Sequence, residues 1–224
     1  PEALAAASAE LEAFSRLLIH AEACRCARFI FLSSGGCIYG PSSEALIRED
    51  HPTRPINSYG YLKLCCESLL GVFRDQAGMD AVILRPSNCY GPCQRVRHGQ
   101  GVIASFVAAI RNSKPITLYG DGSVERDFIF VRDLVEAIAS VLSPPVSSNW
   151  IFNVSSGQAH SLRWIVEQLE LLNGSPALIE HKSARRFDAP RIALDPSALM
   201  TATEWRPRTA LHVGLCEQWD AFRP

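Results

Sequence analysis

Tyr59 and Lys63, in the stretch Ser58-Tyr-Gly-Tyr-Leu-Lys63, are the residues whose types and spacing most directly suggest chemistry. Four residues apart on a helix, their side chains would project from the same face, one turn apart. A phenol is a poor base at neutral pH because its pKa is about 10, but a nearby ammonium stabilises the phenolate and lowers that value. The pair could therefore act as a general acid and base. The same spacing also arises by chance on amphipathic helices, so the surrounding elements must decide.

Composition and charge narrow the classes of protein to consider. Of the 224 residues, 47% are apolar and 20% are charged, which is typical of a soluble globular protein. The formal net charge of −1 indicates no general nucleic-acid footprint. No apolar run approaches the roughly 18 residues of a membrane helix, and the start carries Glu rather than a basic segment. We therefore expect no nucleic-acid partner, no membrane partner and no signal peptide.

The eight cysteines are scattered along the chain. None forms a paired Cys-x-x-Cys framework with zinc spacing, and Cys24-Arg25-Cys26 is the nearest approach to a metal motif. We predict no metal site. Most of the other cysteines lie in apolar or turn stretches and are interpreted as reduced, small core residues, which favours the cytoplasm.

Two apolar runs are predicted to be buried strands beside the Tyr59 motif. Residues 28–32 have the sequence Arg-Phe-Ile-Phe-Leu and lead into Ser33-Ser-Gly-Gly36. Residues 80–84 have the sequence Asp-Ala-Val-Ile-Leu and lead into Arg85-Pro-Ser-Asn88. Sites in parallel sheets form at the carboxyl ends of the strands, so these two polar segments are expected to lie close together.

A helix between these strands is predicted to carry the pair. Asn57 or Ser58 can cap its start, apolar residues then repeat at helical spacing, and Gly78 can end it. Tyr59 and Lys63 would lie in its first turns, away from the main apolar stripe. The helix and the two strand ends are therefore expected to converge.

The rest of the chain alternates strands with helices, and residues 41–55 form a polar, Pro-rich loop. Further helices are expected within residues 2–22, 99–112, 134–142, 162–172 and 211–222. Further strands are expected at residues 116–119, 128–131 and 150–154. This alternation predicts an α/β fold with a mostly parallel sheet.

Several ordered motifs resemble a known family. They are Phe29-Ile-Phe-Leu-Ser-Ser-Gly-Gly-Cys-Ile-Tyr-Gly40, Ser58-Tyr-Gly-Tyr-Leu-Lys63, Leu84-Arg-Pro-Ser-Asn-Cys-Tyr-Gly-Pro92 and Leu118-Tyr-Gly-Asp-Gly-Ser-Val-Glu-Arg-Asp-Phe-Ile-Phe-Val-Arg-Asp-Leu134. Residues 152–154, 185–188 and 205–207 extend the match. The chain resembles extended short-chain dehydrogenases/reductases, and more narrowly the NAD-dependent epimerase/dehydratase branch of the UDP-glucose 4-epimerase type.

The resemblance implies a Rossmann-like parallel sheet, whose N-terminal strands have no counterpart here, with a smaller C-terminal α+β substrate domain. Residues 1–86 and 127–150 would belong to the NAD-binding domain. Residues 87–126 and 151–224 would belong to the nucleotide-sugar-binding domain.

The resemblance also implies a mechanism. Tyr59 would take the proton from a sugar hydroxyl while hydride leaves the same carbon for NAD, and hydride would return to the other face of the keto sugar. Lys63 would bind the nicotinamide ribose and, with the positive ring, lower the tyrosine pKa. Ser34 would supply a third hydroxyl, and Ser33 and Pro86 would also contact the cofactor. NADP is an open alternative to NAD.

The resemblance assigns the nucleotide sugar, most often a UDP-sugar, to six further positions: Asn88, Thr117, Tyr119, Arg126, Arg185 and Asp188. Asn88 would bind the diphosphate, and it could otherwise be a plain turn residue. The two arginines offer planar forks of donors that suit phosphate, and they could otherwise form surface salt bridges. Asp188 would meet the nucleoside ribose, and the strand from Thr117 to Tyr119 would line the base.

The chain departs from the family pattern at the third hydroxyl. The usual Ser or Thr position falls on Gly35, and the alternative position holds Cys37, whose thiol is a weak donor. Ser34 is the neighbouring substitute. The loop also lacks the Asp-Glu pair of sugar dehydratases, so epimerase or simple oxidoreductase chemistry is favoured over dehydration. Decarboxylases, keto-sugar reductases and a non-catalytic nucleotide-sugar-binding remnant remain alternatives.

The glycine-rich turn that cradles the pyrophosphate in this family has no match in the chain. A fragment, a truncated product and a diverged protein are the three explanations. Residues 29–32 would then form an open, apolar sheet edge. We expect the isolated chain to bind NAD poorly and to be marginally stable. A homodimer through helices at about 2–22 and 58–77 is also expected.

Overall fold

The structure is a computed structural model that describes residues 2–94, 101–142, 149–184 and 189–222. Its helices are α1 (Glu2–Ala23), α2 (Gly35–Ile38), α3 (Ser58–Ala77), α4 (Val102–Arg111), α5 (Val131–Ser140), α6 (Leu162–Asn173), α7 (Ser197–Ala202) and α8 (Leu211–Ala221). Its strands are β1 (Phe29–Leu32), β2 (Ala81–Pro86), β3 (Asn88–Tyr90), β4 (Ile116–Tyr119), β5 (Glu125–Phe130), β6 (Ile151–Val154), β7 (Ala159–Ser161), β8 (Ile179–Lys182) and β9 (Arg191–Ile192). None of the helices in these ranges has the length and apolar character needed to cross a membrane.

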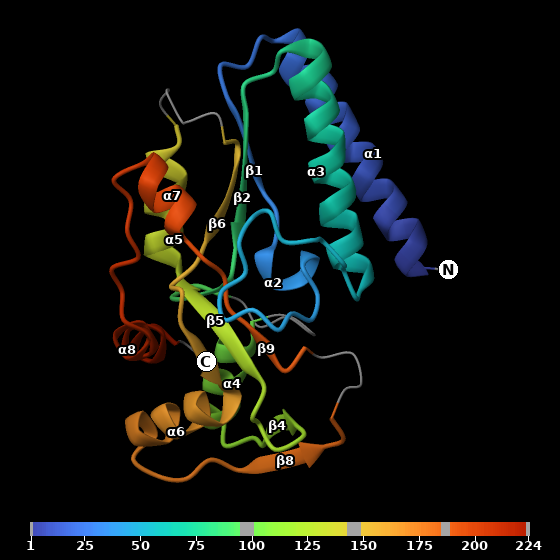
Figure 1. Cartoon of the computed structure of the whole chain (residues 1–224). Coiled ribbons are helices and arrows are strands. Elements are labelled where there is room, and N and C mark those ends of the chain that lie inside the picture. The colour runs from blue at the N-terminus through green and yellow to red at the C-terminus, as the bar shows by residue number, and fades with distance from the viewer. Residues whose placement is uncertain (1, 95–100, 143–148, 185–188, 223–224) are drawn as a thin grey trace.

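The first layer of the fold is a parallel sheet in the order β1-β2-β6. The pair α1 and α3 covers one face, and α5 and α7 cover the other (Figure 1). Along β2, Ala81 and Ile83 pack toward α1 and α3, while Val82 and Leu84 pack toward α5 and α7. The strand is therefore apolar on both faces, which is why its sequence is a continuous apolar run.

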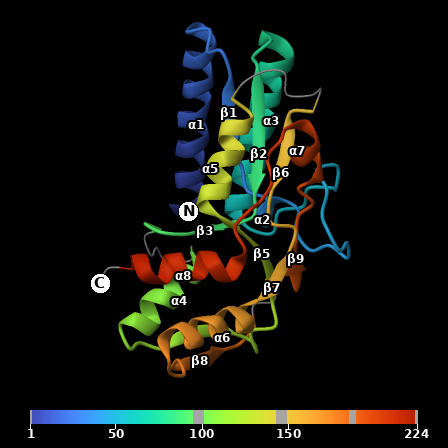
Figure 2. The same cartoon turned by 90° about the vertical axis from the view of Figure 1, so that its left-hand side faces the viewer.

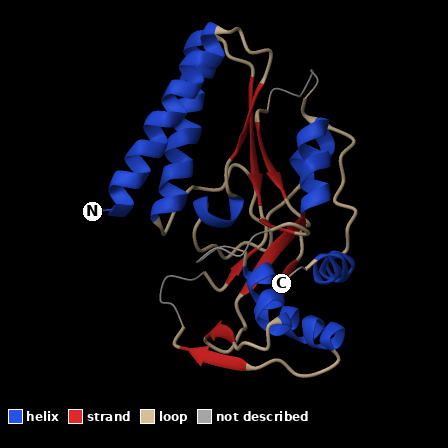
Figure 3. Ribbon diagram, turned by 180° about the vertical axis from the view of Figure 1, so that it is seen from behind, coloured by secondary structure: helices blue, strands red, loops and turns tan. Residues whose placement is uncertain are grey.

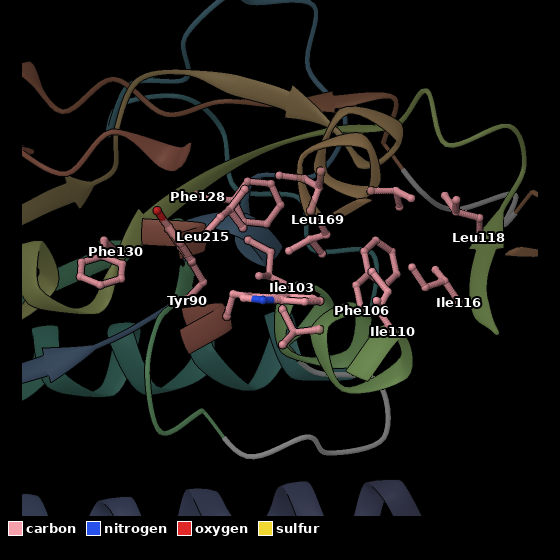
Figure 4. Close-up of a cluster of buried hydrophobic side chains, with 14 residues drawn as sticks. Tyr90, Ile103, Phe106, Ile110, Ile116, Leu118, Phe128, Phe130, Leu169 and Leu215 are labelled. Carbon is pink, nitrogen blue, oxygen red and sulfur yellow. The ribbon is translucent and has the colours of Figure 1, made fainter. Parts of the chain in front are cut away.

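The second part of the fold is built around β5. This strand pairs in parallel with β3 and β9 and antiparallel with β7, while β4 pairs in parallel with β8. Helices α4, α6 and α8 gather beside these strands (Figure 2). They enclose a core that includes Tyr90, Phe128, Phe130 and Leu215 (Figure 4). The predicted α/β architecture with a mostly parallel sheet is confirmed.

Helix α3 begins and ends where its sequence indicates. The Asn57 side chain accepts a hydrogen bond from the Gly60 backbone N–H at 2.8 Å, so Asn57 is the cap. At the other end Gly78 takes the left-handed conformation, with φ 69°, and donates its N–H to the Phe73 carbonyl. The helix runs alongside α1, at the N-terminus, as the view from behind shows (Figure 3).

Several short elements differ from the sequence prediction. Residues 35–38, expected in a loop, form α2, and β3 follows directly after β2. The strand expected at 128–131 is β5, which begins at Glu125 and gives way to α5 at Val131. The tail contains α7, β8 and β9, which the pattern did not resolve. Elements of two to six residues carry too few positions for a periodicity to show.

Strand β6 lies in the first sheet, although residues 151–224 were assigned to the second part. The division into two domains otherwise stays a prediction.

All eight cysteines are free thiols, as expected. The expectation that most of them are core residues is wrong, because only Cys66 is buried and five are exposed. Small side chains in short turns and on outer helix faces were mistaken for buried ones.

Candidate active site

The two strand ends and the start of α3 meet at a cavity of about 480 Å³. It lies at the carboxyl ends of β1 and β2, which are neighbours in the parallel sheet. Its lining includes five of the predicted site residues: Ser33, Ser34, Tyr59, Pro86 and Asn88. The predicted convergence is therefore observed, and the individual roles of these residues stay predictions.

A second cavity of about 470 Å³ adjoins the first. Its lining includes Asn88, Thr117, Tyr119 and Arg126, four of the positions predicted to bind the nucleotide sugar. Cys37, Asn57, Asn88 and Val102 line both cavities. The two cavities are therefore neighbours, with Asn88 and Cys37 in the lining of both.

Tyr59 and Lys63 lie on the same face of α3, as their spacing predicts. Tyr59 is 41% exposed. The Lys63 Nζ atom lies 5.6 Å from the centre of the Tyr59 ring and 5.0 Å from that of Phe31. It donates a hydrogen bond of 3.3 Å to the carbonyl of Leu32, the last residue of β1. The ammonium is therefore held at the strand end, beside the phenol.

The pKa of Tyr59 is raised in the chain by itself. Burial raises the pKa of Tyr59 above its ordinary value of 10.0, and the nearby Cys37 and Glu10 add to the increase. The lowering by Lys63 together with a positive ring was predicted for the complex with NAD, and it stays a prediction. The Lys63 ammonium is directed to a backbone carbonyl, and the partial burial of the phenol dominates.

The position of the usual third hydroxyl is closed to any side chain. A Cβ atom at Gly35 would run into Leu194 Cδ1 and lie 2.9 Å from the Arg85 carbonyl oxygen. Ser34 precedes α2 without a side-chain capping bond. Ser33 is only 4% exposed, and among the described residues its Oγ atom has no hydrogen-bond partner. Both serines line the first cavity.

A buried polar network, which the sequence did not reveal, surrounds Arg85, the residue before Pro86 of the cavity lining. Arg85 binds Glu67 through two hydrogen bonds of 2.6 and 3.1 Å and donates to the Tyr39 hydroxyl at 2.9 Å. The Tyr39 hydroxyl donates to Asn153 Oδ1 at 2.8 Å. The Asn153 backbone N–H in turn donates to Glu49 at 2.7 Å. The network joins α3, β2 and β6 to Tyr39, the residue that follows α2.

Two features of the sequence correspond to this network, although neither one predicts it alone. Arg85 is a charged residue at the end of an apolar strand, and Glu67 follows Lys63 by one helical turn. Burial raises the pKa of Tyr39 to about 12, even though the Arg85 guanidinium beside it acts to lower it. Tyr39 is therefore a neutral structural hydroxyl rather than an acid or base.

Asp127 is a second buried group that the sequence reasoning missed. Its carboxylate accepts hydrogen bonds from the Ser87 hydroxyl, from the N–H and hydroxyl of Ser156, and from the N–H groups of Gly157 and Leu194. Burial raises the pKa of Asp127 to about 6, against these hydrogen bonds. The side chain ties β5 to Ser87 after β2, to the turn after β6 and to Leu194 after β9. An acidic residue directly before Phe-Ile-Phe in the sequence was its signal.

Four of the six residues that were predicted to bind the nucleotide sugar lie among the described residues. Arg126 donates hydrogen bonds from Nη1 to two backbone carbonyl groups at 2.7 and 2.8 Å, which orient its guanidinium at the second cavity. Thr117 and Tyr119 lie on β4 and line the same cavity. Arg185 and Asp188 lie outside the described residues.

Known proteins are similar to this chain in sequence and in fold. Residues 2–155 match the model of the NAD dependent epimerase/dehydratase family. The chain is 34% identical over 190 residues to dTDP-4-dehydro-6-deoxyglucose reductase of Escherichia coli, covering 85% of this chain and 60% of that protein. It is 32% identical over 206 residues to UDP-glucose 4-epimerase of Mycolicibacterium smegmatis, covering 91% of this chain and 66% of that protein.

A solved structure of the same kind of enzyme is similar to this chain in fold. The UDP-glucose 4-epimerase of Thermus thermophilus, in complex with NAD, matches with a TM-score of 0.84 and 31% identity. The match covers 92% of this chain and 67% of that one. The chain thus spans about two thirds or less of the length of the two curated relatives above. The predicted Rossmann-like fold and family are confirmed: the chain belongs to the NAD-dependent epimerase/dehydratase family.

Proposed function

We propose that the protein is an NAD-dependent nucleotide-sugar epimerase of the UDP-glucose 4-epimerase type. One observation carries the proposal: the cavity beside Tyr59 shares four lining residues with the cavity lined by Thr117, Tyr119 and Arg126, so the two are neighbours. A nucleotide sugar is elongated, with a sugar at one end and a base at the other. Such a ligand could place its sugar at Tyr59 and its base beside β4, with its diphosphate near Asn88.

Ser33 and Pro86 in the lining of the first cavity, together with Lys63 on the helix that carries Tyr59, offer groups for the nicotinamide end of NAD. Ser33 offers a buried hydroxyl without a partner in the described chain, and Lys63 presents an ammonium at the end of β1. Pro86 is the last residue of the neighbouring strand β2 and lines the same cavity. NAD supplies the hydride acceptor and donor when it is bound, and NADP is an open alternative.

The chain's own contribution is to hold and move one proton. Because burial raises the pKa of Tyr59, the phenol is protonated at neutral pH in the chain by itself. Before it reacts, Tyr59 is therefore a hydrogen-bonding partner of the sugar hydroxyl, and it takes the hydroxyl proton only when its phenolate is stabilised. It becomes a base as nearby positive charge, Lys63 included, stabilises its phenolate.

We extend the proposal to domains and assembly. Residues 1–86 and 127–150 were expected to form the cofactor part; we now place β5 with the substrate part, because it pairs with β3, β7 and β9, and we place β6 and α7 with the cofactor part, because they adjoin β2. Residues 87–126 and the remainder form the substrate part. A homodimer through α1 and α3 is supported by large apolar side chains exposed on these helices: Leu17, Ile19, Tyr61 and Val72. A cytoplasmic location is still a prediction from cysteine usage.

Interconversion of UDP-glucose and UDP-galactose by the purified protein tests the proposal, with Tyr59→Phe as the variant. Loss of the phenolic hydroxyl should reduce kcat by about 10²- to 10⁴-fold, as expected for a general acid/base. Tyr61→Phe is the matched control. Tyr61 lies on the same helix, is 57% exposed and is not part of either cavity lining, so this variant should keep wild-type activity. A Tyr59→Phe variant as active as Tyr61→Phe would contradict the proposed role.

A reductase acting on a dTDP-linked keto sugar is the second candidate. It is favoured by the identity to the Escherichia coli reductase, which is 34%, compared with 32% to the Mycolicibacterium smegmatis epimerase. Net consumption of NAD(P)H would indicate the reductase, whereas an epimerase returns its cofactor unchanged. A non-catalytic nucleotide-sugar-binding protein would gain support if neither turnover were found and binding persisted.

A further inference from the structure

Asn57, the cap of α3, lines both cavities of the candidate site. The residues shared by the two linings are Cys37, Asn57, Asn88 and Val102. Only the two asparagines among them carry amide groups, since the Cys37 thiol is a weak donor and Val102 has an apolar side chain. A ligand that occupies both cavities therefore passes these two amide groups.

The helix cap fixes the direction in which the Asn57 amide faces. Its Oδ1 atom accepts the hydrogen bond from the Gly60 N–H at 2.8 Å. Because a backbone N–H can only donate, the atom that meets it is the oxygen, and the Nδ2 group lies on the other branch of the amide. Asn57 is exposed, and its Nδ2 group has no hydrogen-bond partner among the described residues. Both N–H bonds of this group are thus available to a ligand.

The amide of Asn88 is less available. Its Nδ2 group donates to the Asp127 carbonyl at 2.9 Å, which uses one of its two N–H bonds. Its Oδ1 atom is an acceptor, and an ionised phosphate oxygen offers no proton to it. Asn57 therefore offers more unused donors to an anion in this region than Asn88 does.

The surroundings of Asn57 favour a negative charge. Asn57 caps the N-terminus of α3 and Val102 is the first residue of α4, so two helix N-termini adjoin the region that both cavities share. Helix N-termini carry a partial positive charge and present N–H groups to anions. Among the described residues that line the cavities, Arg126 has the only charged side chain. An anion here would meet no like charge from the lining.

We propose that Asn57 binds the diphosphate of the nucleotide sugar through its Nδ2 group while its Oδ1 atom caps α3. One side chain then serves both the ligand and the helix that carries Tyr59. Hydrogen bonds from an amide to a charged phosphate oxygen are stronger than those between neutral groups. The identity of the ligand as a nucleoside diphosphate rests on the proposed function.

Two variants separate ligand binding from capping, because Asn, Asp and Ser are about equally good caps. Asn57→Ser and Asn57→Asp should therefore keep the melting temperature of the wild type. Asn57→Ser lacks the amide donors, so its affinity for UDP, measured calorimetrically, should fall about tenfold. Asn57→Asp places a carboxylate beside the diphosphate, so its loss should be larger and should shrink as salt is added.

Asn173→Asp is the matched control for the change in charge. Asn173 is an exposed residue of α6 and belongs to neither cavity lining, so this variant should bind UDP like the wild type.

Several outcomes would overturn the proposal. An unchanged affinity of Asn57→Ser for UDP would show that the Nδ2 group faces only solvent. A loss in Asn57→Asp no larger than that in Asn57→Ser would assign the contact to an uncharged part of the ligand. A loss seen with UDP-glucose but not with UDP would assign Asn57 to the sugar.

Binding and turnover are separate measurements, which distinguishes this proposal from the proposed function. A wild-type protein that interconverts UDP-glucose and UDP-galactose, with an Asn57→Ser variant that binds UDP normally, would overturn this proposal alone. A wild-type protein that binds UDP without converting UDP-glucose would contradict the epimerase activity, and the two Asn57 variants would still decide the contact. A wild-type protein without measurable UDP binding would overturn both.

Discussion

The ion pair between Glu67 and Arg85 should be the most stability-sensitive contact near the cavity. Both side chains are only 5% exposed, and the shorter of their two hydrogen bonds is 2.6 Å. Replacing Glu67 by Leu leaves the Arg85 guanidinium buried without its counter-charge. Removing one partner of a buried pair typically costs about 3–5 kcal/mol. The bonds from Arg85 to the Tyr39 hydroxyl and the Glu49 carbonyl remain, so we expect the lower end, about 3 kcal/mol.

Urea denaturation at pH 7, followed by circular dichroism, measures this loss of unfolding free energy. The chain contains a matched control, because Arg16 and Glu12 form an ion pair with the same 2.6 Å separation but with side chains 73% and 64% exposed. Glu12→Leu should therefore cost less than about 0.5 kcal/mol. Arg85→Met together with Glu67→Leu should cost less than the sum of the two single losses, with a coupling of about 2 kcal/mol. Equal losses for Glu67→Leu and Glu12→Leu would refute the reasoning that burial, rather than distance, determines the contribution.

Two further predictions concern Asp127 and Gly60. Burial raises the pKa of Asp127 from 3.8 to about 6, so the folded state holds this proton more tightly than the unfolded state. Its contribution to stability is therefore full below about pH 4 and is lost as the pH rises through 6, a change of about 3 kcal/mol. Urea denaturation at pH 4 and pH 7 should show that Asp127→Asn lacks this part of the pH dependence, and an unchanged pH dependence would contradict it. Gly60→Ala should destabilise by about 1–3 kcal/mol in thermal unfolding, because a Cβ there would lie 2.5 Å from the Cys37 carbonyl oxygen and 3.0 Å from Pro55 Cβ. Gly71→Ala on the same helix, whose Cβ would lie 3.4 Å from the Trp150 ring, should be neutral or stabilising, and equal stabilities of the two variants would refute the packing explanation.

Much of the fold could be predicted because it depends on local chemistry. The apolar runs of β1 and β2, the Asn57 cap and the Gly78 end of α3 are properties of neighbouring residues. The short β3, β7, β9 and α7 escaped prediction, since their formation depends on the strands and helices that they pack against. Part of the candidate site followed from strand order, because parallel strands end at a common edge.

The sequence by itself determined which residues could do chemistry and on which element they lie. Tyr59 and Lys63 share a helix face because the helical repeat requires it. Only the tertiary structure decided their surroundings. Three features depend on residues that are distant along the chain. They are the lack of space for a side chain at Gly35, the burial of the Ser33 hydroxyl and the ion pair between Arg85 and Glu67. Such contacts depend on how whole elements pack, and no local pattern encodes them. The direction of the Tyr59 pKa follows for the same reason, because burial is a property of the folded surroundings.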